Sequence, residues 1–285
     1  MDPARTIEIG PADAGLRLDA VVARALGLSR GWVRKLLDAE LVLLAGKPGA
    51  KGLILHEGDR IDVLPFARPD AGPLASPELP LSIVRESGGL VAIDKPAGLA
   101  VHPLRPDETG TALNALVARF PELVGVGEGG LRSGVVHRLD PGTSGVLAFA
   151  LREEAWRAAR TAFKEKRVTK RYVARVHGSF RGEREISLRL ENRGAHVRVV
   201  EHGGRLAVSQ LRALETGDES SLVEIRMRTG VRHQIRATLA ELGHPVVGDQ
   251  LYGSSAALSR HLLHALSLAW DDFAAEAELP AEFSL

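Results

Sequence analysis

The sequence contains no cysteine among its 285 residues, and this absence excludes several kinds of protein. Without cysteine there is no disulfide framework, no thiolate nucleophile and no cysteine-based zinc cluster. The ten histidines show no spacing typical of a metal site, so we expect no metal. Any chemistry must therefore come from oxygen and nitrogen groups.

Long apolar runs and a leader segment are also missing. No apolar stretch approaches the roughly 20 residues that a membrane-spanning helix needs. Residues 1–5 lack the basic-then-apolar order of a signal peptide. A hydrophobic fraction of 45% suits an ordinary soluble chain of about two domains. We therefore expect a cytoplasmic protein without a membrane partner, and we favour a monomer.

Lysine is scarce, since only seven of the 37 basic residues are lysines and the rest are arginines. Arginine is the side chain better suited to bidentate phosphate contacts and to stacking. The net charge of +1 is spread unevenly: residues 131–175 hold eleven basic and four acidic residues, whereas residues 270–285 hold five acidic residues and no basic one. The positive charge therefore surrounds one stretch, residues 135–146.

That stretch reads VVHRLDPGTSGV. Apolar residues with strand character flank a turn of Pro, Gly, Thr, Ser and Gly, so we expect an ionisable cluster at the end of a strand. Strand alternation then places Arg138 and Asp140 on one face and His137 on the other. Taken alone, an Asp before a Pro-Gly turn is more often a solvated turn residue than a reacting group.

The chain before residue 66 predicts a small α/β domain over residues 14–65. An apolar stripe from residue 18 to residue 26, ending at Gly27, indicates one helix, and Ser29 can cap a second. Strands are expected at residues 41–44 and just after Gly58.

The order of these features resembles the S-four RNA-binding domain. The resemblance implies that the basic second helix and the following turn contact structured RNA, here through Arg30, Arg34, Lys35 and Lys47. Trp32 departs from the pattern, because it stands at a position that is usually small and polar. The alternative is a docking or folding module whose charges are simply solvated.

Residues 66–80 hold four prolines and little periodicity, which predicts a linker. A larger domain over residues 81–285 follows. Its expected strands are at residues 83–84 and 90–93 as a hairpin, 146–150, 170–176 and 223–227, with a further hairpin at residues 197–208. Its expected helices are at residues 111–119, around 156–163, and up to residue 242. This mixture predicts an α+β fold with a mixed, largely antiparallel sheet flanked by helices.

Two groups of basic residues are candidate anion ligands. Arg232 and Arg236 are four apart, so we expect them on the same side of a helix near its N-terminus, where backbone N–H groups also favour anions. The alternative is a pair of solvated arginines on a surface helix. Lys95 and His102, in a stiff proline-containing loop, are either phosphate ligands or ordinary loop residues.

Several motifs in order resemble the RluA-type RNA pseudouridine synthases, over about residues 82–283. The motifs are His137-Arg138-Leu139-Asp140 with Thr143-Ser144-Gly145, Lys170-Arg171-Tyr172, Thr229-Gly230, and His233-Gln234-Ile235-Arg236. Supporting matches include Asp94-Lys95-Pro96, Gly248-Asp249, Tyr252-Gly253 and Leu263-His264-Ala265. The resemblance implies that a uridine in RNA is isomerised, without a cofactor, by moving its glycosidic bond from nitrogen 1 to carbon 5.

The resemblance also implies roles for individual residues. Asp140 matches the catalytic aspartate, Arg236 the arginine that pairs with it, and Tyr172 the tyrosine that packs under the target base and is a candidate for proton transfer. Arg138 matches the arginine that fills the stack when the uridine is flipped out. The remaining residues expected to contact RNA in this domain are His137, Thr143, Lys170, Arg232, His233 and Gln234.

The substrate is less sharply indicated. The layout resembles family members that act on large-subunit ribosomal RNA, and a tRNA-directed enzyme is one alternative. Another is a non-catalytic RNA-binding factor for ribosome assembly. Pro141, Gly142 and Val231 depart from the family pattern and are expected to change the contacts with RNA.

Overall fold

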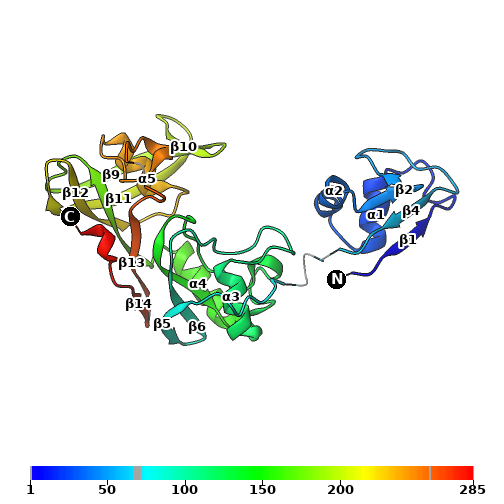
Figure 1. The fold of residues 1–285 in the computed structure, drawn as a ribbon, viewed down its shortest axis with the longest axis horizontal. Coiled ribbons are helices and arrows are strands. Elements are labelled where there is room, and N and C mark those ends of the chain that lie inside the picture. The colour runs from blue at the N-terminus through cyan, green and yellow to red at the C-terminus, as the bar shows by residue number, and fades with distance from the viewer. Residues whose placement is uncertain (1, 67, 69–71, 257, 285) are drawn as a thin grey trace. The chain divides into compact units, whose positions relative to one another are not determined.

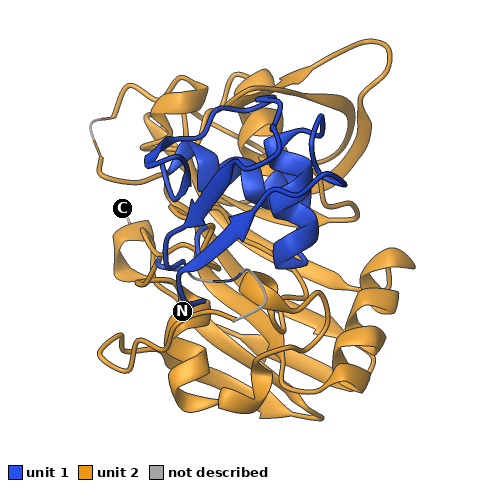
Figure 2. Ribbon diagram, turned by 90° about the vertical axis from the view of Figure 1, so that its right-hand side faces the viewer, with its two compact units in different colours: residues 1–71, 105–107 blue, residues 72–104, 108–285 orange. Residues whose placement is uncertain are grey.

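The chain folds into two compact units, seen in different colours in Figure 2. The computed structural model describes residues 2–66, 68, 72–256 and 258–284. One unit comprises residues 1–71 with 105–107, and the other comprises residues 72–104 and 108–285. Residues 67 and 69–71 of the predicted linker lie outside the described residues.

The first unit packs two helices on a small antiparallel sheet. Its elements are β1 (Arg5–Glu8), α1 (Leu18–Leu26), α2 (Arg30–Asp38), β2 (Val42–Leu44), β3 (Lys47–Pro48) and β4 (Arg60–Val63). The strand order is β1-β4-β2-β3. Leu18, Val22 and Leu36 from the helices share one core with Val42 and Ile61 from the sheet.

Both predicted helices of this unit are confirmed with their ends. Gly27 has φ 65° and ends α1, while the Ser29 hydroxyl accepts the Trp32 backbone N–H at 3.3 Å and begins α2. Strand β1 is not predicted by its sequence, because Arg5–Glu8 contains a single apolar residue. It pairs with β4, so this unit begins before the predicted boundary at residue 14.

The second unit is built on one ten-stranded sheet (Figure 1). Its strands are β5 (Ser82–Ser87), β6 (Leu90–Lys95), β7 (Ser144–Ala150), β8 (Thr169–His177), β9 (Glu183–Arg193), β10 (His196–Val199), β11 (Arg205–Thr216), β12 (Ser220–Met227), β13 (Leu263–Trp270) and β14 (Phe273–Glu276). The order is β10-β9-β11-β12-β8-β13-β7-β6-β5, with β14 beside β13. Among the described pairs, β7 and β13 run parallel and the others antiparallel, which confirms the mixed, largely antiparallel sheet.

Helices cover both faces of this sheet. The helices α3 (Ala112–Arg119) and α5 (Gln234–Glu241) share a core with β6, β7, β8 and β12. On the other face, α4 (Glu153–Lys164) packs through Ala159 and Ala162. Thr111 and Asn114 form a capping box that fixes the start of α3. No described helix has the length and apolar character that crossing a membrane requires.

The second half of the predicted linker is fastened to α3. The Asn114 side chain donates to the Leu74 carbonyl at 2.7 Å, and the Ser76 backbone N–H donates to the Asn114 carbonyl at 3.0 Å. Ser76 is buried. From Leu74 onward this stretch is therefore part of the second unit.

The predicted hairpin at residues 197–208 is wrong. Strands β10 and β11 do not pair with each other, because β9 lies between them. On one side of β9, Leu190 pairs with Val199 of β10, and on the other side it pairs with Arg205 of β11. The alternation of Ile186, Leu188 and Leu190 was the signal for this missing strand.

The strand predicted before Asp140 is also wrong. Residues 136–140 form no ladder, and the regular strand β7 begins only after the turn, at Ser144. The His137 ring explains part of the missing strand pairing. Its Nε2 accepts the Ala148 backbone N–H at 3.0 Å, where a paired strand would offer a backbone carbonyl. Asp140 therefore precedes a strand rather than ending one.

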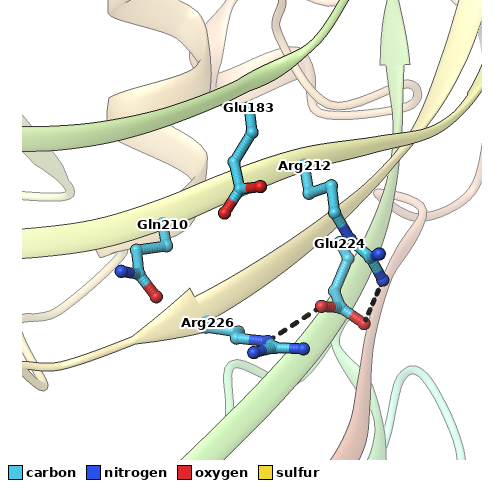
Figure 3. Close-up of a pocket in the computed structure, with 5 residues that line it drawn as sticks. All are labelled: Glu183, Gln210, Arg212, Glu224 and Arg226. Atoms are coloured by element: carbon cyan, nitrogen blue, oxygen red, sulfur yellow. Dashed lines mark hydrogen bonds and ion pairs between the residues drawn. The ribbon is translucent and has the colours of Figure 1, made fainter.

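Glu224 lies on the face of the sheet opposite to Tyr172, and its buried carboxylate is surrounded by arginines (Figure 3). Glu224 accepts from Arg171 at 2.7 Å and Arg226 at 2.9 Å, and it lies 3.6 Å from Arg212. Burial alone raises the pKa of Glu224, but the hydrogen bonds from Arg171 and Arg226 outweigh it and lower the pKa. Glu224, Arg212 and Arg226 line a cavity of about 170 Å³ together with Glu183 and Gln210.

Replacing Glu224 with Gln is expected to lower the free energy of unfolding by about 2 kcal/mol. This is less than the roughly 3–5 kcal/mol of a fully buried pair, because the three arginines are 33% to 55% exposed and water can solvate them. Urea unfolding at neutral pH measures the change. The exposed Glu183→Gln is the matched control and should stay within about 0.5 kcal/mol of the original chain. Equal stabilities of the two variants would contradict this role.

Candidate active site

Asp140 lies in a turn whose backbone is held from several directions. The Thr143 backbone N–H donates to the Asp140 carbonyl at 3.0 Å and closes the turn. The next carbonyl, that of Pro141, accepts from the Lys95 ammonium at 2.9 Å and from the Gly98 backbone N–H at 2.9 Å. The loop after β6 therefore fixes the peptide that follows Asp140.

Lys95 serves this loop and does not bind phosphate. It is fully buried, and its ammonium also donates to the carbonyls of Pro96 and Leu99 at 2.8 Å each. Burial lowers the pKa of Lys95 to about 8. His102 is buried too, with Nδ1 3.0 Å from the Pro103 carbonyl. Of the two alternatives for these residues, the structure supports the ordinary loop residue.

Arg236, on α5, connects two carboxylates. Its Nη1 donates to Asp140 Oδ2 at 2.7 Å, while Nε and Nη2 donate to the two oxygens of Asp249 at 2.6 and 2.8 Å. Burial opposes the charge on Arg236, but the hydrogen bonds with Asp249 and Asp140 outweigh it and raise the pKa above the ordinary value. The guanidinium is therefore permanently charged, and Asp249 fixes its orientation toward Asp140.

His233 places a second nitrogen near the same carboxylate. Its φ is 51°, in the left-handed region, at the residue before α5. The Tyr252 hydroxyl accepts the Val197 backbone N–H at 2.8 Å and lies within hydrogen-bond distance of His233 Nδ1, at 2.9 Å. The other ring nitrogen, Nε2, lies 3.7 Å from Asp140 Oδ2. Burial lowers the pKa of His233, which favours the neutral ring.

The pairing register of three neighbouring strands sets the position of Tyr172. Across neighbouring strands, Gly145 of β7 is opposite Ala265 of β13, which is opposite Tyr172 of β8. Gly145 has φ 105°, and a Cβ there would lie 2.2 Å from the Ala265 carbonyl oxygen, so only glycine fits. Burial, and then the charge of Asp140, raise the pKa of Tyr172, so its phenol stays protonated.

A cavity of about 330 Å³ opens beside these groups. Its polar lining includes Asp140, His233, Arg236, Asp249, Arg260 and His261. This volume is at the lower end of the range of small-molecule pockets, roughly 300–1,000 Å³, and suits one nucleotide base.

Three residues of the site were given no role by the sequence reasoning. Asp249 and Tyr252 lie in matched motifs, but their contacts with Arg236 and His233 join separate segments and have no local spacing signal. His261 lines the cavity, and its Nε2 is 2.9 Å from Thr143 Oγ1. Burial lowers the pKa of His261 to about 4, so it is neutral at physiological pH.

The predicted anion site at the start of α5 is wrong. The helix begins at Gln234, so Arg232 precedes it and does not share a side with Arg236. The Arg232 guanidinium instead donates to the carbonyls of Gly194 and Ala195 at 2.9 and 3.0 Å, in the turn between β9 and β10.

The other predicted RNA contacts divide by exposure. Arg138 is exposed, and no hydrogen bond or ion pair of its side chain is found within the described parts of the chain.

The remaining predicted contacts already have partners inside the protein. Thr143 and Gln234 are buried, and the Gln234 side-chain amide forms hydrogen bonds with Thr229, Val231, Val208 and Ser209. The Lys170 ammonium donates to the Thr229 carbonyl at 2.8 Å, and burial lowers its pKa to about 8. His137 is occupied by the Ala148 N–H. Among these predicted RNA contacts, Arg138 is therefore the residue near Asp140 whose guanidinium N–H groups have no described partner.

Acid is expected to destabilise the second unit through its buried histidines. Burial lowers the pKa of His261 and of His264 to about 4 each. An unfolded histidine has a pKa near 6.5, so between pH 6.5 and 4 the unfolded state binds more protons and stability falls as the pH falls. Each histidine then costs about 2 kcal/mol at pH 5 relative to pH 7 or above.

The test compares urea unfolding at pH 7 and pH 5. His264→Asn keeps an acceptor for Ser144, whose Oγ lies 2.9 Å from His264 Nδ1, and should reduce the difference between the two pH values by about 2 kcal/mol. His202→Asn, at an exposed histidine, is the control and should leave that difference unchanged. The same pH dependence in both variants would contradict the assignment.

Comparison with known proteins agrees with this geometry. The family model described as RNA pseudouridylate synthase matches residues 89–241. The chain is 37% identical to an uncharacterized RNA pseudouridine synthase of Synechocystis, slr1629, over 94% of this chain and 87% of that protein. It is 36% identical to ribosomal large subunit pseudouridine synthase D of Neisseria meningitidis, over 85% of this chain and 64% of that protein.

A solved structure supports the same relationship. Human RNA pseudouridylate synthase domain containing 1 superposes with a TM-score of 0.57 at 30% identity, covering 70% of this chain and 83% of that one. The fold and the similar sequences are those of enzymes that isomerise uridine in RNA. The chain belongs to the RNA pseudouridylate synthase family, in its RluA-type branch.

Proposed function

We propose that this enzyme isomerises specific uridines of large-subunit ribosomal RNA, with Asp140 as the reacting carboxylate. The observation that carries the proposal is the 2.7 Å hydrogen bond from Arg236 to Asp140 at the edge of the cavity. The Asp140 side chain is 25% exposed, so a substrate can reach it, whereas Asp249 on the same guanidinium is 1% exposed.

The reaction needs no oxidant or reductant. The bond between the ribose carbon and nitrogen 1 of uracil breaks, the base turns, and a new bond forms from the same carbon to carbon 5. Carbon 5 then loses a proton, and nitrogen 1 gains one. A carboxylate can take part as a nucleophile or a base, and Arg236 holds that of Asp140 in place by a hydrogen bond.

Neighbouring groups have distinct parts in this proposal. Tyr172 packs against the target base with a protonated phenol, which can donate but not accept a proton at neutral pH. The His233 ring lies beside Asp140, with Nε2 3.7 Å from Oδ2. Arg138 replaces the flipped uridine in the RNA stack, because a flat guanidinium with free donors can both stack and bind phosphate.

The first unit is proposed to bind RNA as an S-four-like domain. Arg30, Arg34, Lys35 and Lys47 are all exposed, in α2 and at β3. Phosphate contacts of this kind offset part of the few kcal/mol that base flipping costs.

Arg34→Ala should make RNA binding less sensitive to salt, because one phosphate contact is lost. The slope of log affinity against log salt concentration should become shallower by about 0.9.

The substrate is tested with purified protein and unmodified RNA transcripts. The proposal predicts pseudouridine at one or a few positions of large-subunit ribosomal RNA and none in a pool of tRNA transcripts, measured by chemical mapping. Its support is the similarity of this chain to ribosomal large subunit pseudouridine synthases D. Pseudouridine formed in tRNA alone would contradict the proposed ribosomal RNA substrate but not the proposed reaction.

A further inference from the structure

The three tryptophans of the chain have different surroundings. Trp270 is buried in a core of the second unit, and Trp156 packs on that core while its Nε1 donates to the Val135 carbonyl at 3.1 Å. Trp32 is partly exposed and is absent from the core of the first unit. Within the described residues, no hydrogen bond of its indole N–H is found. Its large ring therefore contributes little to folding.

The helix that carries Trp32 is amphipathic, and Trp32 lies at the edge of its apolar face. Val33, Leu36 and Leu37 are the buried residues of α2. Trp32 is four residues before Leu36, so the two are neighbours on the helix surface. On the other side of the ring is Lys35, whose ammonium is 4.8 Å from the centre of the indole.

The exposed polar residues of this helix are mostly cationic. Arg30, Arg34 and Lys35 are exposed on α2, whose acidic residue, Asp38, is at its last position. Arg30 also lies 3.7 Å from the buried Asp19, so that charge is partly balanced. A flat aromatic surface among cations is the combination that binds an unpaired base together with its phosphates.

We infer that Trp32 is a stacking platform for an unpaired nucleobase of the RNA that the first unit binds. The inference rests on the proposed function for its ligand class, RNA. The ring stacks on a base of any identity, since every base has a π-face, while Lys35, beside the ring, binds a neighbouring phosphate. The first unit thereby selects RNA with exposed single-stranded bases over continuous duplex.

The affinity test uses the full chain and two probes, a hairpin RNA with an unpaired loop and a perfect duplex of similar length. Trp32→Ala should weaken hairpin binding about tenfold, within the roughly 5- to 150-fold range of one stacked base, and leave duplex binding unchanged. The salt dependence of hairpin binding should not change in Trp32→Ala, since the ring carries no charge. Trp32→Phe, which keeps a flat ring, should recover most of the affinity.

A spectroscopic readout separates stacking from a structural effect. Tryptophan emission should decrease when the hairpin binds to the original chain, and this decrease should be lost in Trp32→Phe although the variant still binds. Circular dichroism and the unfolding midpoint should be unchanged in Trp32→Ala, because the ring lies outside the core.

The outcomes distinguish this inference from the proposed function. If the original chain forms pseudouridine but Trp32→Ala binds the hairpin as tightly as the original chain, the stacking platform is refuted and the enzyme activity stands. Equal losses for hairpin and duplex would also overturn it. If the original chain binds the hairpin through Trp32 but modifies no RNA, the proposed function fails and the platform stands.

Discussion

Asp140→Asn lowers the rate of pseudouridine formation by at least about a thousandfold and leaves RNA affinity within about twofold. The amide has the size of the carboxylate, and its oxygen can still accept the hydrogen bond from Arg236. It lacks the charge and nucleophilicity that the reaction needs. Single-turnover formation of pseudouridine and equilibrium binding of the same RNA measure the two quantities separately.

Asp272→Asn is the matched control for this change, because Asp272 is an exposed aspartate of the same unit. It should leave both rate and affinity unchanged. A rate for Asp140→Asn close to that of the original chain would place the reacting group elsewhere. A joint loss of rate and affinity would indicate that Asp140 acts in RNA binding.

Arg236→Lys is expected to lower the rate about a hundredfold or more and to destabilise the fold by roughly 3 kcal/mol. The guanidinium uses three nitrogens to join Asp140 and Asp249, whereas an ammonium cannot reproduce this fork. The stability loss comes from Asp249, whose side chain is 1% exposed and would be left with an incomplete partner. Single-turnover kinetics and urea unfolding measure the two effects.

The control for the arginine is Arg232→Lys. Arg232 donates to two backbone carbonyls and has no contact with Asp140, so its replacement should change the rate less than about threefold. The double variant Arg236→Lys with Asp249→Asn should recover part of the stability but not the rate, because the buried charge is removed while Asp140 still lacks its partner. Recovery of the rate in the double variant would contradict the role of Arg236 at Asp140.

The sequence predicted the elements that show a regular pattern over several turns or strand positions. The helices capped by Ser29 and Thr111 and the half-buried strand with Val223, Ile225 and Met227 are examples. It failed where a side chain replaces backbone pairing, as at His137, and where a strand with many charges lies between two others, as in β9. Pairing across the sheet depends on contacts between distant segments, which local patterns do not contain.

The same limit applies to the site. Motif resemblance brought Asp140, Tyr172 and Arg236 to attention. The structure places Asp140 and Arg236 at one cavity, joined by a hydrogen bond of 2.7 Å, and the register of β7, β13 and β8 sets the position of Tyr172, which does not line that cavity. The partner of Arg236, the carboxylate of Asp249, is thirteen residues away in sequence and outside its helix. Spacing could not predict that contact, nor the contact of 2.9 Å between the Tyr252 hydroxyl and His233 Nδ1.

The most direct test of the central claim is to map pseudouridines in the large-subunit ribosomal RNA of cells that lack this protein and carry either the original gene or its Asp140→Asn form. We predict that one or a few positions are uridine in the deletion strain, pseudouridine with the original chain, and uridine again with Asp140→Asn present at equal abundance. Pseudouridine at those positions with the Asp140→Asn chain would contradict the assignment of Asp140 as the reacting carboxylate.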